Sequence, residues 1–392
     1  MLVENVAAET GSNLSKWDSE GIWAYAENPD MSPEFFITCG ILLFTFFVLG
    51  STCNGAVLVA FARHPELITP FQYFLVNLVI SDFVMIAFGA PWDLLAISQF
   101  GWKLGKVPCF IVGFLKMFTG CASLLTLTVL SIQRCLFVWS PAYFSSHGFA
   151  VPKYCVVFVW ILSASFSVPP FLGWSEYVPE QCGLSCAPCF ADERYFGYSV
   201  YILVAGFVIP VIILVVASTC TILRMKYYYK LQKKLKYKKE IINRNEQKDT
   251  AMVLIMAFVF FLSWSGYSII CLLRIFGVTY PDASVAIAMM TAKSSAWTNS
   301  MIYVGMNSKL RRYVLPEWAN SCCEEELEDK EQEVEVATIH SRAMDELEED
   351  ETSPKANQVG PASKTSHDDA SEFTEDSHVC KQLEMTLILQ MS

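Results

Sequence analysis

The sequence predicts an all-α membrane protein: a bundle of seven transmembrane helices, a short amphipathic eighth helix and a disordered C-terminal tail. Hydrophobic residues make up 53% of the chain, and its apolar runs are longer than the core helices of a soluble protein need. A third observation is a strongly basic connector at residues 224–248, which is typical of a cytoplasmic loop between two spans.

Each apolar run is long enough to cross a bilayer as a helix. The runs cover residues 35–62, 71–98, 107–139, 154–173, 196–225, 250–277 and 284–305. We therefore assign residues 35–305 to the transmembrane bundle.

Charge predicts the orientation of the bundle. Residues 1–34 are polar and acidic, whereas the connector before the sixth span is rich in lysine, so the N-terminus is expected to be extracellular and the C-terminus cytoplasmic. Asn13 then lies outside in a glycosylation sequon. No cleavable signal peptide is evident, so the first span is expected to act as the signal anchor.

The chain after the last span divides into two parts. Residues 306–319 read as an amphipathic helix along the membrane, and residues 320–392 as an acidic tail with too few large apolar residues to fold. Cys322 and Cys323 follow the amphipathic stretch and are candidates for palmitoylation, with two free cytosolic thiols as the alternative.

Cysteines on the extracellular side predict a disulfide. Cys109, at the outer start of the third span, and Cys186, in the loop before the fifth, face the oxidising compartment. Cys182 and Cys189 share that loop, which leaves a second bridge open.

Lys293 is a lone charge in the last apolar run. A lysine in the middle of a membrane is costly unless it is paired or chemically changed, which marks it as functional. A desolvated amine is also the group that condenses with an aldehyde, because its neutral form is the nucleophile. A Schiff base on Lys293 is the natural interpretation.

Several motifs occur at matching places in the spans: Asn54-Gly55, Asn77–Asp82, Trp160, Pro210 and Trp264. With Cys109, Arg134 and Asn299–Tyr303, they resemble the rhodopsin-class G-protein-coupled receptors over residues 35–318. A lysine six residues before Asn299, and the loop from Trp174 to Cys186, resemble the opsins. Within that family the chain resembles the non-visual or invertebrate types, which include cnidarian ones. The resemblance implies that Lys293 binds retinal, in the 11-cis form in the dark.

A protonated Schiff base needs an acid nearby. Val112 stands where vertebrate visual pigments carry a glutamate, so the resemblance leaves two counterion candidates, Asp93 in the second span and Glu180 in the loop. Lys116, two turns below Cys109, is a second pocket cation. We expect Lys116 to pair with one acid and to leave the other to the Schiff base. The alternatives are that Lys116 snorkels to water or that it carries the retinal itself.

The resemblance also implies an apolar retinal pocket and a cytoplasmic switch. The switch consists of Arg134, Glu246, Asn299 and Tyr303, and the usual acid beside the arginine is Gln133 here. A glycine, Gly266, and a serine, Ser300, replace the usual prolines of spans six and seven. The pocket candidates are Met85, Gly89, Gly120, Cys121, Phe207, Phe260, Trp264, Tyr267, Met289 and Ala292.

The expected function is that of a light-sensing receptor in the plasma membrane that activates a heterotrimeric G protein. A receptor kinase, arrestin and membrane lipid are further expected partners. No catalytic residue, metal site or nucleic-acid partner is expected. Two alternatives remain at this point, a retinal photoisomerase of the same fold and a receptor for a diffusible ligand.

Overall fold

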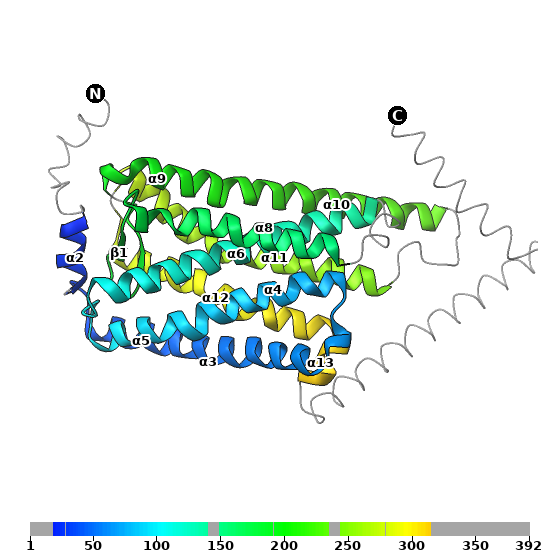
Figure 1. Cartoon of the computed structure of the whole chain (residues 1–392), viewed down its shortest axis with the longest axis horizontal. Helices are drawn as coiled ribbons and strands as arrows, with labels where there is room; N and C mark the ends of the chain where they lie inside the picture. Colours follow the sequence, from blue (N-terminus) through cyan, green and yellow to red (C-terminus); the bar gives the residue numbers. More distant parts are fainter. Residues whose placement is uncertain are drawn as a thin grey trace, which may run out of the picture. The chain divides into compact units, whose positions relative to one another are not determined.

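The computed structural model of the chain describes residues 19–27, 29–139, 149–190, 192–234, 244–278 and 280–314 (Figure 1). Asn13, Cys322, Cys323 and the acidic tail lie outside the described residues. The helices of the bundle run side by side along its long direction, and the short N-terminal helix α2 (Ser19–Glu27) lies at one end.

The first span is α3 (Pro33–Arg63). Ser32 caps it by accepting a hydrogen bond from the Phe35 amide, and Pro33 occupies the first turn, where a missing N–H costs nothing. Its lipid-facing side carries exposed apolar residues such as Ile41 and Phe44, as expected for a helix solvated by acyl chains.

The second span consists of three consecutive segments. A reciprocal capping box between Thr69 and Gln72 starts α4 (Pro70–Val84), which continues through a π-helical segment, η3 (Met85–Gly89), into α5 (Ala90–Ser98). A π segment inserts an extra residue into the helical repeat, which rotates everything beyond it. In α5 this leaves Asp93 fully buried and Trp92 37% exposed.

The third span, α6 (Lys106–Trp139), lies at the centre of the bundle and packs against α4, α8, α10 and α11. The fourth span, α8 (Ala150–Ser167), is the short one and ends in the 3-10 turn η4 (Pro169–Leu172). Consecutive prolines at positions 169 and 170 explain this end, because neither can donate a helical hydrogen bond.

The extracellular loop after η4 folds into a buried hairpin. Strand β1 (Tyr177–Pro179) pairs antiparallel with β2 (Cys186–Pro188), and the disulfide Cys109–Cys186 attaches β2 to the start of α6. The Tyr177 hydroxyl donates to the Ser167 carbonyl at 2.7 Å, which ties β1 to the end of α8. The predicted disulfide is thus present, and Cys182 and Cys189 of the same loop are both buried.

The fifth span begins with η5 (Glu193–Tyr195) and α9 (Phe196–Tyr201), passes through a second π segment, η6 (Ile202–Val208), and continues as α10 (Ile209–Lys234). The span was expected to end near residue 225. Instead the helix continues for more than two turns into the basic connector, whose lysine, leucine and glutamine residues are good helix formers in water.

The sixth span, α11 (Arg244–Ile275), likewise starts earlier than its apolar run. The seventh, α12 (Asp282–Met306), leads through Asn307 into the amphipathic helix α13 (Ser308–Val314). No kink-forming proline interrupts α12, and Ser300 instead donates a hydrogen bond to the Asn54 side chain of α3.

Within the described part of the chain, six helical segments are long and apolar enough to cross a membrane. Helix α12 has 25 residues, which is also a membrane-spanning length, but carries Lys293 and several serines and threonines. Its polar residues face the bundle: Asn299 donates to the buried carboxylate of Asp82 at 2.9 Å. Together these helices form the predicted seven-helix bundle.

Candidate functional site

Two apolar cavities lie side by side between the extracellular hairpin and the middle of the bundle. The empty space, including the part open to solvent, is about 720 Å³ in one and about 600 Å³ in the other. They share five lining residues, Lys116, Met117, Phe190, Trp264 and Tyr267. A long, narrow apolar ligand is the shape that such adjoining spaces suit.

The predicted pocket residues are divided between these cavities. Met85, Met289 and Ala292 line the first, while Gly120, Cys121, Phe207 and Phe260 line the second. Trp264 and Tyr267 line both. Gly89 lies behind Lys116, where an added Cβ would come 3.3 Å from the lysine Cε.

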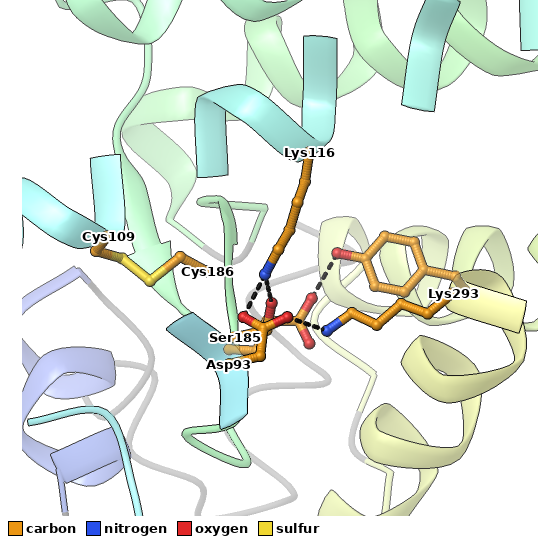
Figure 2. Close-up of polar contacts among 8 residues, drawn as sticks. Asp93, Cys109, Lys116, Ser185, Cys186 and Lys293 are labelled. Carbon is orange, nitrogen blue, oxygen red and sulfur yellow. Dashed lines mark hydrogen bonds and ion pairs between the residues drawn. A yellow bond between two sulfur atoms is a disulfide. The ribbon is translucent and has the colours of Figure 1, made fainter. Parts of the chain in front are cut away.

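The first cavity contains the charged residues (Figure 2). Lys293 Nζ lies 2.6 Å from Asp93 Oδ2, and Lys116 forms an ion pair with Asp93 Oδ1. The Asp93 side chain is completely buried, and the two lysine side chains are 12% and 14% exposed. One carboxylate therefore serves two amines, each from a different helix.

Lys116 is fixed by a second contact. It donates a hydrogen bond of 2.6 Å to the Ser185 hydroxyl, one residue before the disulfide cysteine Cys186 (Figure 2). The partners of Lys116 are thus a buried carboxylate and a hydroxyl next to the hairpin, and the alternative in which its ammonium reaches water is not the arrangement seen.

Glu180 lies at the same cavity but in a different polar environment. It is 3% exposed, and its Oε1 accepts a hydrogen bond of 2.7 Å from the Tyr267 hydroxyl. Its Oε2 is buried with no hydrogen-bond partner among the described residues. We expected each lysine to have its own acid. Instead, both amines contact Asp93, and neither forms an ion pair with Glu180 in the described part of the chain.

Arg274 was missed by sequence reasoning. This residue of α11 lies within electrostatic range of Glu180, and its Nε donates to the Tyr280 hydroxyl at 2.6 Å. Tyr280 lies outside the spans. Burial raises the pKa of its phenol and the nearby Arg274 lowers it, and the effect of burial is the larger, so the pKa is raised. Arg274 ends a span, where an arginine is ordinary, so its sequence position carried no signal.

Other lining residues were also missed. Gly113 and Met117 could have been found, because they follow the helical spacing of Lys116, Gly120 and Leu124 along one face of α6. Phe190 and Ser185 carry no such signal, since they lie in an irregular loop whose path depends on the hairpin and the disulfide.

Trp264 forms the boundary between the two cavities and connects two spans. Its indole Nε1 donates a hydrogen bond of 3.0 Å to the Ser295 hydroxyl of α12, two residues after Lys293. Its ring stacks on Phe260, with centroids 5.6 Å apart. A ligand attached at Lys293 and extending into the second cavity would pass this ring.

The predicted cytoplasmic switch forms an ion pair. Arg134 Nη1 lies 2.9 Å from Glu246 Oε2, across the gap between α6 and α11. Gln133 accepts a long contact of 3.4 Å from the same guanidinium, and the Phe71 ring lies 3.8 Å from its centre. The Tyr303 hydroxyl is buried without a hydrogen-bond partner among the described residues.

Comparisons with known proteins agree with this architecture. Residues 53–303 match the family of 7 transmembrane receptors (rhodopsin family), and the chain belongs to that family. Rhodopsin of Oryzias latipes is 30% identical over 303 residues, covering 75% of this chain and 82% of that protein. Green-sensitive opsin-1 of Carassius auratus is 29% identical over 293 residues, covering 72% and 82%.

The fold is also that of a solved opsin structure. Squid rhodopsin superposes with a TM-score of 0.69 at 23% identity, covering 79% of this chain and 93% of that one. The chain is an opsin: a multi-pass, light-sensing G-protein-coupled receptor with retinal as its chromophore, and a receptor rather than an enzyme.

Proposed function

We propose that Lys293 carries retinal through a Schiff base and that Asp93 is the counterion of this linkage in the dark. The observation that carries the proposal is the contact of 2.6 Å between Lys293 Nζ and the fully buried Asp93 carboxylate, at the wall of an apolar cavity. A buried amine with a carboxylate partner and open apolar space beside it has what a cationic imine requires.

The residues of the cavity fit this chromophore. The neutral Lys293 amine adds to the aldehyde carbon, and water leaves as the carbon–nitrogen double bond forms. Asp93 then stabilises the positive charge on the nitrogen, while the two adjoining apolar cavities receive the polyene and its ring. Bound 11-cis retinal supplies the absorption of light and the change of shape that follows.

The chain turns that change of shape into a signal through α11. Trp264 lies between the cavities and is tied to α12 through Ser295, so pressure on its ring acts on both helices. At the other end of α11, Glu246 holds Arg134. Displacement of α11 separates this ion pair and exposes Arg134 to the G protein, a rigid-body shift of a helix between two packed states.

Supporting functions are assigned to the ends of the chain. The N-terminal segment, residues 1–34, faces the outside of the plasma membrane, and the tail from residue 320 lies in the cytoplasm, where its serines and threonines serve a receptor kinase and arrestin. Glycosylation of Asn13 and palmitoylation of Cys322 and Cys323, which would anchor residues 306–319 to lipid, belong to the same proposal. Mass spectrometry of the protein from membranes would test these modifications.

The decisive experiment is the dark absorption spectrum of the purified protein after reconstitution with 11-cis retinal, compared with Lys293→Ala. We expect a visible band in the wild type and none in the variant. A near-ultraviolet band that the variant lacks would show an unprotonated linkage and remove Asp93 from its dark role. Failure of the wild type to bind retinal would overturn the proposal.

A further inference from the structure

Two amines of this pocket contact one carboxylate, and this relation extends the proposed function. Lys116 and Lys293 bond the two oxygens of Asp93, one each. The amine of Lys116 is not needed for attachment of the chromophore. Its ammonium nevertheless contacts one of the two oxygens that carry the negative charge on which the Schiff base depends.

We propose that Lys116 is a resident cation of the retinal pocket that competes with the Schiff-base nitrogen for Asp93, and so lowers the proton affinity of the linkage. This inference rests on Lys293 being the attachment site. Lys116 acts as a positioning and tuning residue: it sets how much of the Asp93 charge is available to the chromophore.

The position of Lys116 favours this role over a second attachment site. Lys116 lines both cavities, whereas Lys293 and Asp93 line only the first. A polyene attached at Lys293 that extends towards Phe207 and Phe260 therefore passes alongside Lys116. A polyene attached at Lys116 would begin midway along the space and leave part of it unfilled.

The surroundings of Lys116 keep it charged. Its ammonium bonds a carboxylate with no solvent exposure and the hydroxyl of Ser185, which the neighbouring disulfide at Cys186 fixes in place. Removal of one partner from such a buried pair leaves the other charge uncompensated. Neutralising Asp93 alone would therefore leave the Lys116 ammonium without its carboxylate partner.

The groups that face the Schiff-base position come from five elements. They are Cys39 of α3, Asp93 of α5, Lys116 of α6, Glu180 and Cys182 of the extracellular loop, and Tyr267 of α11. Lys116 is the other cation in this set. Glu180 offers partial compensation, but its Oε1 is already committed to Tyr267. The two cations therefore do not each have a carboxylate of their own, and they share Asp93.

The test is a spectrophotometric titration of the dark pigment. In Lys116→Met and Lys116→Gln, which remove the charge, we expect the Schiff-base pKa to rise by about one to three units, the range over which a neighbouring charge moves a titrating group. The absorption maximum of the protonated form should move to shorter wavelength, because the whole Asp93 charge then stabilises the ground state. Lys116→Arg should keep the wild-type pKa.

Two variants complete the design. Lys106→Met removes a lysine from the same helix, outside the pocket, where its ammonium lies 5.8 Å from the Trp23 ring, and should leave the titration unchanged. Asp93→Asn should lower the Schiff-base pKa less in the wild-type background than in Lys116→Met, where the whole Asp93 charge is available to the linkage. An unchanged or lowered pKa in both Lys116→Met and Lys116→Gln would overturn the inference.

A measurement without retinal separates this inference from the proposed function. Lysine amines can be reductively methylated with ¹³C-formaldehyde, and the Lys293 resonance is the one that Lys293→Ala lacks. If Lys116 competes for Asp93, this resonance titrates at lower pH in the wild type than in Lys116→Met, whether or not a pigment forms. Equal titration in both proteins would refute the competition even if Lys293 binds retinal.

Discussion

Trp264 of α11 donates a hydrogen bond of 3.0 Å to Ser295 of α12, two residues after Lys293. The Trp264 side chain lines both cavities. The bond joins α11, the helix that we propose to move, to α12, which carries Lys293. We therefore expect it to restrain the dark state as well as to contribute a packing contact.

Loss of this bond should loosen the dark state. We expect Ser295→Ala to raise basal G-protein activation in the dark by roughly fivefold, which corresponds to about 1 kcal/mol for one hydrogen bond. Ser294→Ala is the matched control, because within the described residues that hydroxyl bonds to the Thr291 carbonyl of its own helix and to no other span. Nucleotide exchange on a purified G protein measures both; equal rates would dismiss the restraint.

The counterion can be assigned by two amide substitutions. Asp93→Asn should lower the Schiff-base pKa by about one to three units, because it removes the carboxylate that Lys293 contacts. Glu180→Gln should have a smaller effect, since Glu180 bonds to Tyr267 and not to the lysine. Glu176→Gln, in the same loop, serves as control. The reverse order of effects would transfer the counterion role to Glu180.

At the cytoplasmic side, Gln133→Glu should strengthen the hold on Arg134. The Gln133 side chain already lies 3.4 Å from the guanidinium, so a carboxylate there would add a charge-assisted contact to a side chain that is only 3% exposed. Dark basal activity should fall, and Gln133→Ala should leave it near the wild-type level. Activity unaffected by the glutamate would mean that the Glu246 ion pair alone sets the restraint.

Gly113 of α6 is required by the extracellular hairpin. A Cβ at this position would lie 2.5 Å from Cδ1 of Tyr177, a ring that is fully buried and held by the Ser167 carbonyl. Gly113→Ala should therefore cost about 1–3 kcal/mol, as overpacking of a core does. Thermal unfolding monitored by fluorescence provides the test. Gly305→Ala, with open space around its Cβ, should not destabilise.

The N-terminal helix α2 is attached to the seventh span by a contact that titrates. Tyr25 donates to Asp282 at 2.5 Å, and burial together with this bond raises the pKa of the phenol from 10.0 to about 12. A raised folded-state pKa means that the stabilisation is complete below pH 10 and is lost as the pH rises through 12.

The stability difference between wild type and Tyr25→Phe should accordingly be constant from pH 7 to about pH 9.5 and shrink above pH 10. Thermal midpoints measured across that range would show it. A difference that grows with pH would contradict the assignment of Tyr25 as the donor.

Hydropathy and isolated charges predicted most of the architecture and the chemistry. Lys293 was found because it is a lone charge inside an apolar run, where a charge is costly unless it is paired. Asp93 and Lys116 were assigned to the pocket through the resemblance to opsins. The pairing among them was not predictable. It depends on the rotation of α5 beyond a π segment and on how the hairpin delivers Ser185, and neither leaves a periodic trace in the sequence.

The ends of α10 and α11 show a different limit. Apolar runs mark where a helix enters lipid, but the helix stops only where its backbone can no longer continue. The residues around Lys226 and Lys230 are too polar for a membrane and well suited to a helix in water. The predicted ends at residues 225 and 250 are the ends of the apolar runs, whereas the helices themselves extend to Lys234 and from Arg244.

The π segment η3 makes the second span intolerant of changes in length. Deletion of one residue among Met85–Gly89 would turn α5 by about 100° relative to α4. Asp93 would then leave the cavity, the two lysines would lose their shared anion, and Leu94 would take the place that Asp93 occupies. A substitution in this segment keeps the helical register, whereas a single-residue deletion changes it.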